Sequence, residues 1–128
     1  MKILLDTHIF LWFVGGDPAL TAASRAAVES PENERLLSIA SVWEMAIKVS
    51  LGKLMLPADF GSFIATQMAA NDIGLLGVEM AHLNVVVGLP FHHRDPFDRL
   101  LIAQAIAEQI SIVSQDRLFD VYPVTCIR

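Results

Sequence analysis

Short apolar segments alternate with longer segments whose apolar residues recur at helical spacing along the whole chain. The short segments predict strands at residues 2–5, 35–39, 73–78, 111–114 and 121–127, the last weakened at its start by Pro123. The longer segments predict helices at residues 8–14, 17–30, 41–51, 59–70, 79–87 and 95–109. Because apolar strands that alternate with helices are covered on both faces, the pattern predicts an α/β fold with a parallel sheet.

Composition limits the number of domains and the kind of partner. With 128 residues, the chain is expected to form one domain over residues 1–128. Apolar residues make up 54% of the chain, above the usual share of about 45–50%, which indicates a surface that a second chain covers. The net charge of −5 argues against nucleic-acid binding by bulk positive charge, but an enzyme whose carboxylates hold cations remains compatible with it.

The sequence also indicates the compartment in which the protein works. The single cysteine, Cys126, excludes an internal disulfide and any zinc site that needs several cysteines. No run of about 18 uninterrupted apolar residues occurs, so we expect no membrane span. Asp6 and His8 interrupt the N-terminal apolar stretch, and no convincing signal-peptide cleavage site follows it. These features together predict a cytoplasmic protein.

Four carboxylates fall just after predicted strands or in the first turn of helices at the same edge of the sheet. They are Asp6, Glu44, Asp98 and Asp116. Ligand sites of parallel α/β sheets lie at the carboxyl ends of the strands, where the strand order reverses. Carboxylates held close together repel one another, and hard divalent cations remove that cost. Such a site predicts one or two Mg²⁺ or Mn²⁺ ions and phosphodiester hydrolysis by a metal-activated water.

Some of these acidic residues also have a structural interpretation. Ser41-x-x-Glu44 has the pattern of a capping box, in which the Glu44 side chain would bond to the Ser41 backbone N–H. Asp95 before Pro96 has the pattern of a helix N-cap, so capping or support of the neighbouring acids is its favoured role. Asp116 could start a turn. The position of all four acids at one predicted edge favours the metal site.

Other polar residues beside the acids are candidates for secondary roles. The hydroxyls of Thr7 and Ser114 could hold a carboxylate or a metal-bound water, or they could cap the local backbone. Lys48 lies one helical turn beyond Glu44, a spacing that also gives an ordinary ion pair. Three arginines next to the acids are candidates for phosphate contacts, with surface ion pairs as the alternative: Arg94, Arg99 and Arg117.

The histidines and the tryptophan near the predicted site match no recognised ligand pattern. His8, His92 and His93 fit no zinc spacing, and adjacent histidines in a loop are usually solvated. We therefore expect a structural rather than a chemical role for His92 and His93. Trp12 could stack on a nucleobase. A short apolar helix beside a crevice is more often core or partner interface, and we favour the interface for Trp12.

Four segments resemble, in order, the motifs of PIN-domain nucleases and of their VapC-type toxin branch. They are Leu4-Leu5-Asp6-Thr7-His8, residues 41–54 beginning Ser-Val-Trp-Glu, residues 93–105 beginning His-Arg-Asp-Pro-Phe-Asp, and Ser114-Gln115-Asp116-Arg117-Leu118-Phe119. The match covers essentially the whole chain, and the third segment is the most specific. The four acids of the family motif fall on Asp6, Glu44, Asp98 and Asp116, and none is missing.

This resemblance implies a single PIN-like domain with a central parallel five-stranded sheet in the order 3-2-1-4-5, flanked by helices. It also implies an acidic Mg²⁺ or Mn²⁺ site, a homodimer, and endoribonuclease activity on an RNA substrate. The activity would be restrained by a cognate VapB-type antitoxin. An acidic crevice that a basic antitoxin segment occupies would be consistent with the negative net charge.

Three other functions stay open at this point. A receiver domain of a signalling protein also carries an acidic Mg²⁺ pocket, but it needs a lysine after a later strand, and no lysine follows Lys53. A catalytically inactive PIN-like module would keep the fold and only dimerise or bind a partner. A DNA-acting nuclease of the same fold also fits, since nothing in the sequence reads a 2′-hydroxyl.

Overall fold

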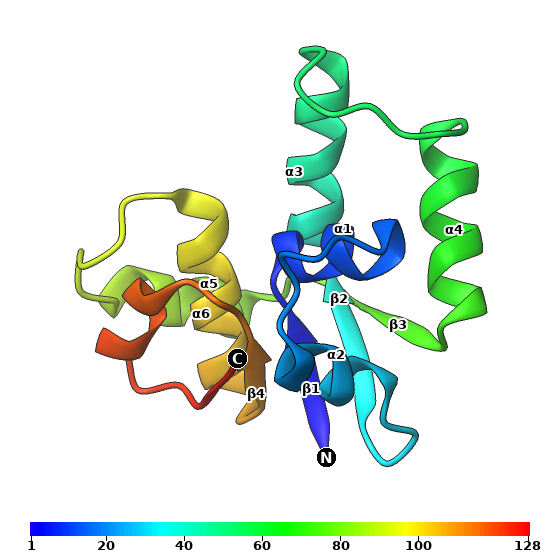
Figure 1. The fold of residues 1–128 in the computed structure, drawn as a ribbon. Helices are drawn as coiled ribbons and strands as arrows, with labels where there is room; N and C mark the ends of the chain where they lie inside the picture. The colour runs from blue at the N-terminus through cyan, green and yellow to red at the C-terminus, as the bar shows by residue number, and fades with distance from the viewer.

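The computed structural model describes residues 1–128, and two helices follow each of its first three strands (Figure 1). The strands are β1 (Lys2–Leu5), β2 (Glu34–Ser38), β3 (Ile73–Leu76), β4 (Ser111–Val113) and β5 (Cys126–Ile127). The helices are α1 (Thr7–Gly15), α2 (Ala22–Glu29), α3 (Ile39–Ser50), α4 (Phe60–Ala70), α5 (Met80–Gly88) and α6 (Pro96–Glu108). A short 3₁₀ helix, Arg117–Val121, lies between β4 and β5. None of the helices is long and apolar enough to cross a membrane.

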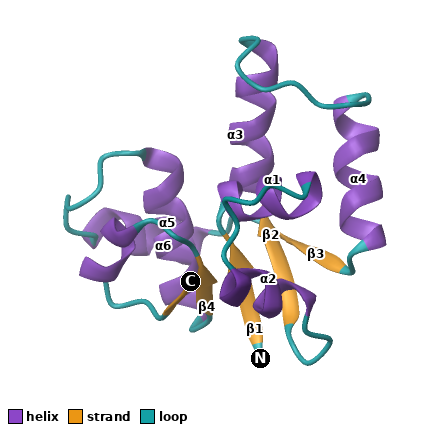
Figure 2. Cartoon of the chain, viewed as in Figure 1, coloured by secondary structure: helices purple, strands orange, loops and turns teal.

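The five strands form one parallel sheet in the order β3-β2-β1-β4-β5, which confirms the predicted fold class and strand order. β1 lies at the centre, and its side chains alternate between the two faces of the sheet. Ile3 and Leu5 pack into one core with residues of α1, α2, α3 and α4. Leu4 packs into a second core, to which α6 contributes Leu101 and Ile102. Helices therefore cover both faces, as Figure 2 shows.

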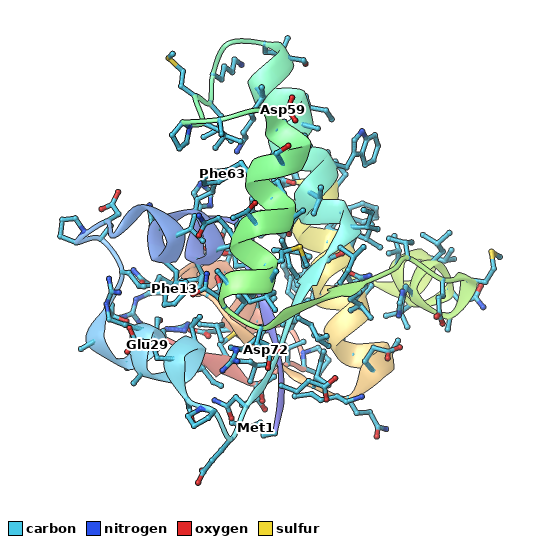
Figure 3. The ribbon with its side chains drawn as sticks, turned by 90° about the vertical axis from the view of Figure 1, so that its right-hand side faces the viewer. Met1, Phe13, Glu29, Asp59, Phe63 and Asp72 are labelled. Carbon is cyan, nitrogen blue, oxygen red and sulfur yellow. The ribbon has the colours of Figure 1, made fainter.

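Two long helices reach beyond the sheet. Figure 1 shows α3 rising from the end of β2 and α4 returning beside it. In Figure 3, α4 stands in front and runs from Asp59, its N-cap, to the turn at Asp72 that leads into β3. Gly52 follows α3 with a left-handed φ of 72°, and its N–H donates to the Val49 carbonyl, as expected for a glycine after a helix end.

Two predicted elements are much shorter than expected, whereas the other strands and helices differ by one or two residues at their ends. The helix predicted over 17–30 begins at Ala22, because Asp17 accepts a bond from the Ala19 N–H at 2.8 Å and closes a separate turn. Thr21 then provides the helix cap by accepting from the Ser24 N–H. The strand predicted over 121–127 is confined to β5, because the 3₁₀ helix and Pro123 occupy its first part.

Candidate metal centre

Asp6 lies at the carboxyl end of the central strand. Its backbone N–H donates to the Val113 carbonyl of β4, so the residue sits where β1 and β4 separate. Its carboxylate is buried and accepts a 2.8 Å hydrogen bond from the Ser114 hydroxyl. Burial raises the pKa of Asp6 above its ordinary value, and the bond from Ser114 and the nearby His8 only partly oppose that rise. A nearby cation would therefore stabilise the charged form of Asp6.

Glu44 reaches the same region from α3, and its role differs from a capping box. The N-cap of α3 is Ser38, three residues before Ser41, so Glu44 does not face the helix end. Thr7 Oγ1 lies 2.8 Å from Glu44 Oε1 and 2.8 Å from Ser41 Oγ. A hydroxyl has one proton, so Ser41 donates to Thr7 and Thr7 donates to the carboxylate. Glu44 is thereby fixed to the start of α1.

Lys48 completes the surroundings of Glu44. Its Nζ lies 3.1 Å from Glu44 Oε2, which is the ordinary i,i+4 ion pair anticipated for this spacing. The Glu44 side chain is only 9% exposed, so this pair is better shielded from solvent than an ordinary surface pair. One oxygen of Glu44 is therefore bonded to Thr7 and the other to Lys48.

Asp95 and Asp98 begin α6. Asp95 Oδ1 accepts from the backbone N–H groups of Phe97, at 2.8 Å, and Asp98, at 3.2 Å, so Asp95 has the capping role predicted for it. Asp98, one turn into the helix, is electrostatically coupled to the other acids. Burial, followed by repulsion from the carboxylates of Asp6, Asp95, Glu44 and Asp116, raises the pKa of Asp98 to about 8.

His93 joins this cluster, and the expectation that it lies in solvent is wrong. Its ring is buried, with Nε2 3.1 Å from Asp98 Oδ2 and 3.3 Å from Asp116 Oδ2. Its Nδ1 accepts from the Asp95 N–H at 3.2 Å, so Nε2 carries a proton and donates to the two carboxylates. His93 thus bridges the start of α6 and the segment after β4. His92, by contrast, is exposed as expected.

Long-range contacts hold His93 in place. The Tyr122 hydroxyl accepts from the His93 backbone N–H at 2.8 Å and itself donates to the Pro90 carbonyl. The Phe119 ring packs edge-on against the imidazole, with centroids 5.8 Å apart. Both partners come from the segment beyond β4, and Tyr122 lies 29 residues further along the chain than His93. The only local signal for the position of His93 was its place two residues before the capping Asp95.

Asp116 combines the predicted turn with a place in the cluster. Its Oδ1 accepts from the Leu118 N–H at 2.9 Å and starts the 3₁₀ helix, while its Oδ2 faces His93. The Asp116 N–H donates to the Ser114 hydroxyl, which in turn donates to Asp6. Ser114 therefore links the Asp6 carboxylate, after β1, to the backbone of Asp116, after the adjacent strand β4.

The three candidate arginines separate into two groups. Arg99 is buried, and its guanidinium donates to the carbonyls of Pro90, at 2.8 Å, and Leu89, at 3.0 Å. The guanidinium also lies 4.0 Å from the centre of the Phe91 ring. Arg99 therefore holds the loop before α6 and is not free for the phosphate contact predicted for it. Arg94 and Arg117 are exposed and form no ion pair, so they keep their candidate role.

The donor set fits a hard divalent cation. Carboxylate oxygens of Asp98 and Asp116 lie within 4.8 Å of one another beside the His93 ring. Asp6 and Glu44 act electrostatically on the same Asp98 carboxyl. Oxygen donors of this kind suit Mg²⁺ or Mn²⁺ rather than zinc or copper. Burial and, after it, the neighbouring carboxylates raise the pKa of Asp98, which is the cost of holding a charged carboxylate here without a cation. A bound cation would remove that cost.

A second group of potential ligands is accounted for by a helix cap. His82 is fully buried in α5, and its Nδ1 accepts from the Glu79 backbone N–H at 3.0 Å. Its Nε2 lies 3.0 Å from Glu108 Oε2 on α6. Glu79 accepts in return from the N–H of His82, so the group closes a capping box and ties α5 to α6.

The sequence of this chain matches a protein-family model and known relatives. The model described as PIN domain matches residues 3–124. The chain belongs to the PIN-domain family. Ribonuclease VapC22 from Mycobacterium tuberculosis (strain ATCC 25618 / H37Rv) is 28% identical over 116 residues, which are 90% of this chain and 87% of that protein. Ribonuclease VapC16 from the same strain is 41% identical over 59 residues, which are 46% of this chain and 42% of that protein.

A solved structure shares the fold over nearly the whole chain. It is the crystal structure of VapBC2 from Rickettsia felis bound to a DNA fragment from their promoter. The TM-score is 0.73 at 17% identity, and the match covers 98% of this chain and 97% of that one. At this identity the likeness shows the shared fold.

Proposed function

We propose that this protein is a metal-dependent endoribonuclease and the toxin component of a toxin–antitoxin pair. The observation that carries the proposal is the arrangement of Asp98 and Asp116 around the His93 ring. Ser114 ties Asp6 to the segment that holds Asp116, and Asp6 and Glu44 both act on the Asp98 carboxyl. The relatives named ribonuclease VapC support RNA as the substrate. The proposed nuclease domain comprises residues 1–128.

In this centre the acidic residues and the hydroxyl residues would have different roles. Asp6, Asp98, Asp116 and Glu44 would hold one or two Mg²⁺ or Mn²⁺ ions. A bound ion of this kind polarises a phosphodiester and lowers the pKa of a water ligand, so no side chain needs to act as general base. The hydroxyls of Ser114 and Thr7 fix the carboxylates of Asp6 and Glu44.

Two further groups of residues support this centre. His93 would orient Asp98 and Asp116 by donating to both. Arg94 and Arg117, exposed beside the acids, are the residues we propose for contacts to the RNA phosphates.

The proposed partners are a VapB-type antitoxin and a second copy of the chain. A cavity of about 380 Å³ between the end of α3 and the start of α4 is lined mainly by apolar residues, including Leu54, Met55 and Phe60. Met55 is 90% exposed, and Met80 and Val87 on α5 are also largely exposed. Such apolar surface is typical of protein contacts and supports both partners. We place the protein in the cytoplasm, where its single cysteine would stay reduced.

Cleavage of matched RNA and DNA pools by the purified, antitoxin-free protein tests the proposed function. We expect cleavage of RNA in Mg²⁺ or Mn²⁺, none in EDTA, and little cleavage of DNA. Preferential cleavage of DNA would reassign the protein to the DNA-acting alternative. Saturable Mn²⁺ binding without cleavage of either pool would favour the inactive binding module. Absence of metal binding would contradict the proposed centre itself.

A further inference from the structure

A cavity of about 400 Å³ opens beside the acidic centre, on the α1 side. It is lined by Asp6, His8, Trp12, Gln115 and Asp116. Two of these residues, Asp6 and Asp116, belong to the proposed metal centre, so the cavity and the centre share a wall. Its volume lies within the range of small-ligand sites in proteins, about 300–1,000 Å³. A molecule whose phosphate lies at the acids would therefore have room for an adjacent group here.

Two rings of α1 face this cavity. His8 and Trp12 are four residues apart, so helical geometry places them on the same face. Their ring centroids lie 5.7 Å apart with the planes at 44°. Trp12 is half-buried and packs against the core that contains Ile9 and Phe10, whereas His8 is exposed. The indole is thus held in place by the core, while the imidazole is open to solvent.

The part of the wall that Gln115 forms is also held in place. Gln115 Oε1 accepts from the Thr21 N–H at 3.0 Å, and its Nε2 donates to the Ala19 carbonyl at 3.0 Å. These bonds tie the segment after β4 to the segment before α2. The cavity is therefore formed by the fold before any ligand enters, which lowers the entropic cost of binding.

We infer that this cavity binds a nucleobase of the RNA, with Trp12 as its stacking surface and His8 as a second ring contact. The inference rests on the proposed ribonuclease function and adds a substrate contact to it. Aromatic rings bind the faces of all bases, so stacking would supply affinity that a site rich in carboxylates lacks. Trp12 then has a substrate role instead of the partner interface expected from sequence.

Tryptophan fluorescence tests this inference without requiring cleavage. The chain contains two tryptophans, Trp12 and Trp43. Trp43 lies on α3, is 60% exposed, and packs edge-on against Phe97 rather than lining the cavity. Trp43→Phe therefore leaves Trp12 as the single reporter, and Trp12→Phe leaves Trp43 as the matched control. The probes are nucleoside 5′-monophosphates, which have no phosphodiester to hydrolyse, and inorganic phosphate, both in Mg²⁺.

We expect mononucleotides to quench the Trp43→Phe protein saturably and inorganic phosphate not to do so. The Trp12→Phe protein should show no saturable quenching. Trp12→Leu should weaken mononucleotide binding, measured by calorimetry, about fivefold or more. Absence of saturable quenching, equal quenching by phosphate, or the same response from Trp43 would overturn the inference. RNA cleavage with no base-dependent quenching would overturn the base site alone, whereas saturable quenching without cleavage would support the base site and count against the ribonuclease.

Discussion

Replacement of Asp98 by asparagine should stabilise the metal-free protein although it removes a proposed metal ligand. The pKa of Asp98 is raised to about 8, first by burial and then by the surrounding carboxylates. The folded state therefore holds this proton more tightly than the unfolded state does. As a result, the stability of the metal-free protein should fall as the pH rises from about 4 to about 8. An asparagine at this position would carry no charge and would escape that loss.

The rise in the pKa of Asp98 sets the size of the expected gain in the free energy of unfolding. A rise from 3.8 to about 8, at 1.36 kcal/mol per pH unit, sets an upper bound of about 6 kcal/mol. The Asp98 side chain is 19% exposed, so water and salt screen part of the repulsion. We therefore expect Asp98→Asn to raise the free energy of unfolding by about 1–3 kcal/mol at pH 8, and by progressively less toward pH 4.

Urea unfolding in EDTA at pH 4, 6 and 8 measures this difference. Glu32→Gln is the matched control, because Glu32 is an exposed carboxylate in the loop before β2 and its side chain makes no hydrogen bond. The control should change the free energy of unfolding little at any pH. An Asp98→Asn protein that is no more stable than the wild type at pH 8 would refute the raised pKa of Asp98 that burial and the neighbouring carboxylates cause.

With Mn²⁺ in place of EDTA, the free energy of unfolding should rise more for the wild type than for Asp98→Asn. A ligand that binds only the folded state at ten times its Kd adds about 1.4 kcal/mol to the free energy of unfolding. We expect the wild type to gain that amount and Asp98→Asn to gain much less at the same Mn²⁺ concentration. Equal gains would show that the bound metal does not contact Asp98.

Three further predictions concern the residues around the acids. His93→Ala should weaken Mn²⁺ binding about 10- to 100-fold in calorimetric titration, because Asp98 and Asp116 lose their shared donor; unchanged affinity would contradict this role. Asp95→Ala should lower the free energy of unfolding in urea by about 1 kcal/mol, since two backbone N–H groups at the start of α6 lose their acceptor; no loss would contradict the cap. Arg99→Lys should lower the free energy of unfolding in urea by about 1–3 kcal/mol, because an ammonium cannot keep both the carbonyl contacts and the position over Phe91. An unchanged free energy of unfolding would argue against that packing.

The sheet and the acidic edge were predictable because their signals are local. β1 is a short, mainly apolar run that ends just before Asp6, and β4 ends just before Ser114, so the sequence itself places polar residues after the ends of adjacent strands. Asp95 before Pro96 is a local capping pattern, and the structure confirms it. The strand order itself came from the family resemblance, not from the periodicity.

The parts that were missed depend on distant contacts or on competing local bonds. His93 looked like a loop histidine because Tyr122 and Phe119, which bury and hold it, lie far along the chain. Arg99 looked like a phosphate ligand because nothing local shows that the carbonyls before α6 converge on it. The Asp17 turn competes with a helix start, and its bond to Ala19 decides the outcome.

The most direct test of the proposed centre is the metal dependence of RNA cleavage in single-turnover reactions by matched variants. The wild type, Asp6→Asn, Asp98→Asn and Glu32→Gln would each be titrated with Mn²⁺ on the same RNA. We predict cleavage by the wild type and by Glu32→Gln that rises with Mn²⁺ and disappears in EDTA. Both aspartate variants should lose nearly all of this activity while remaining folded. Cleavage by Asp6→Asn and Asp98→Asn at the wild-type rate would contradict the assignment of these acids to the catalytic metal.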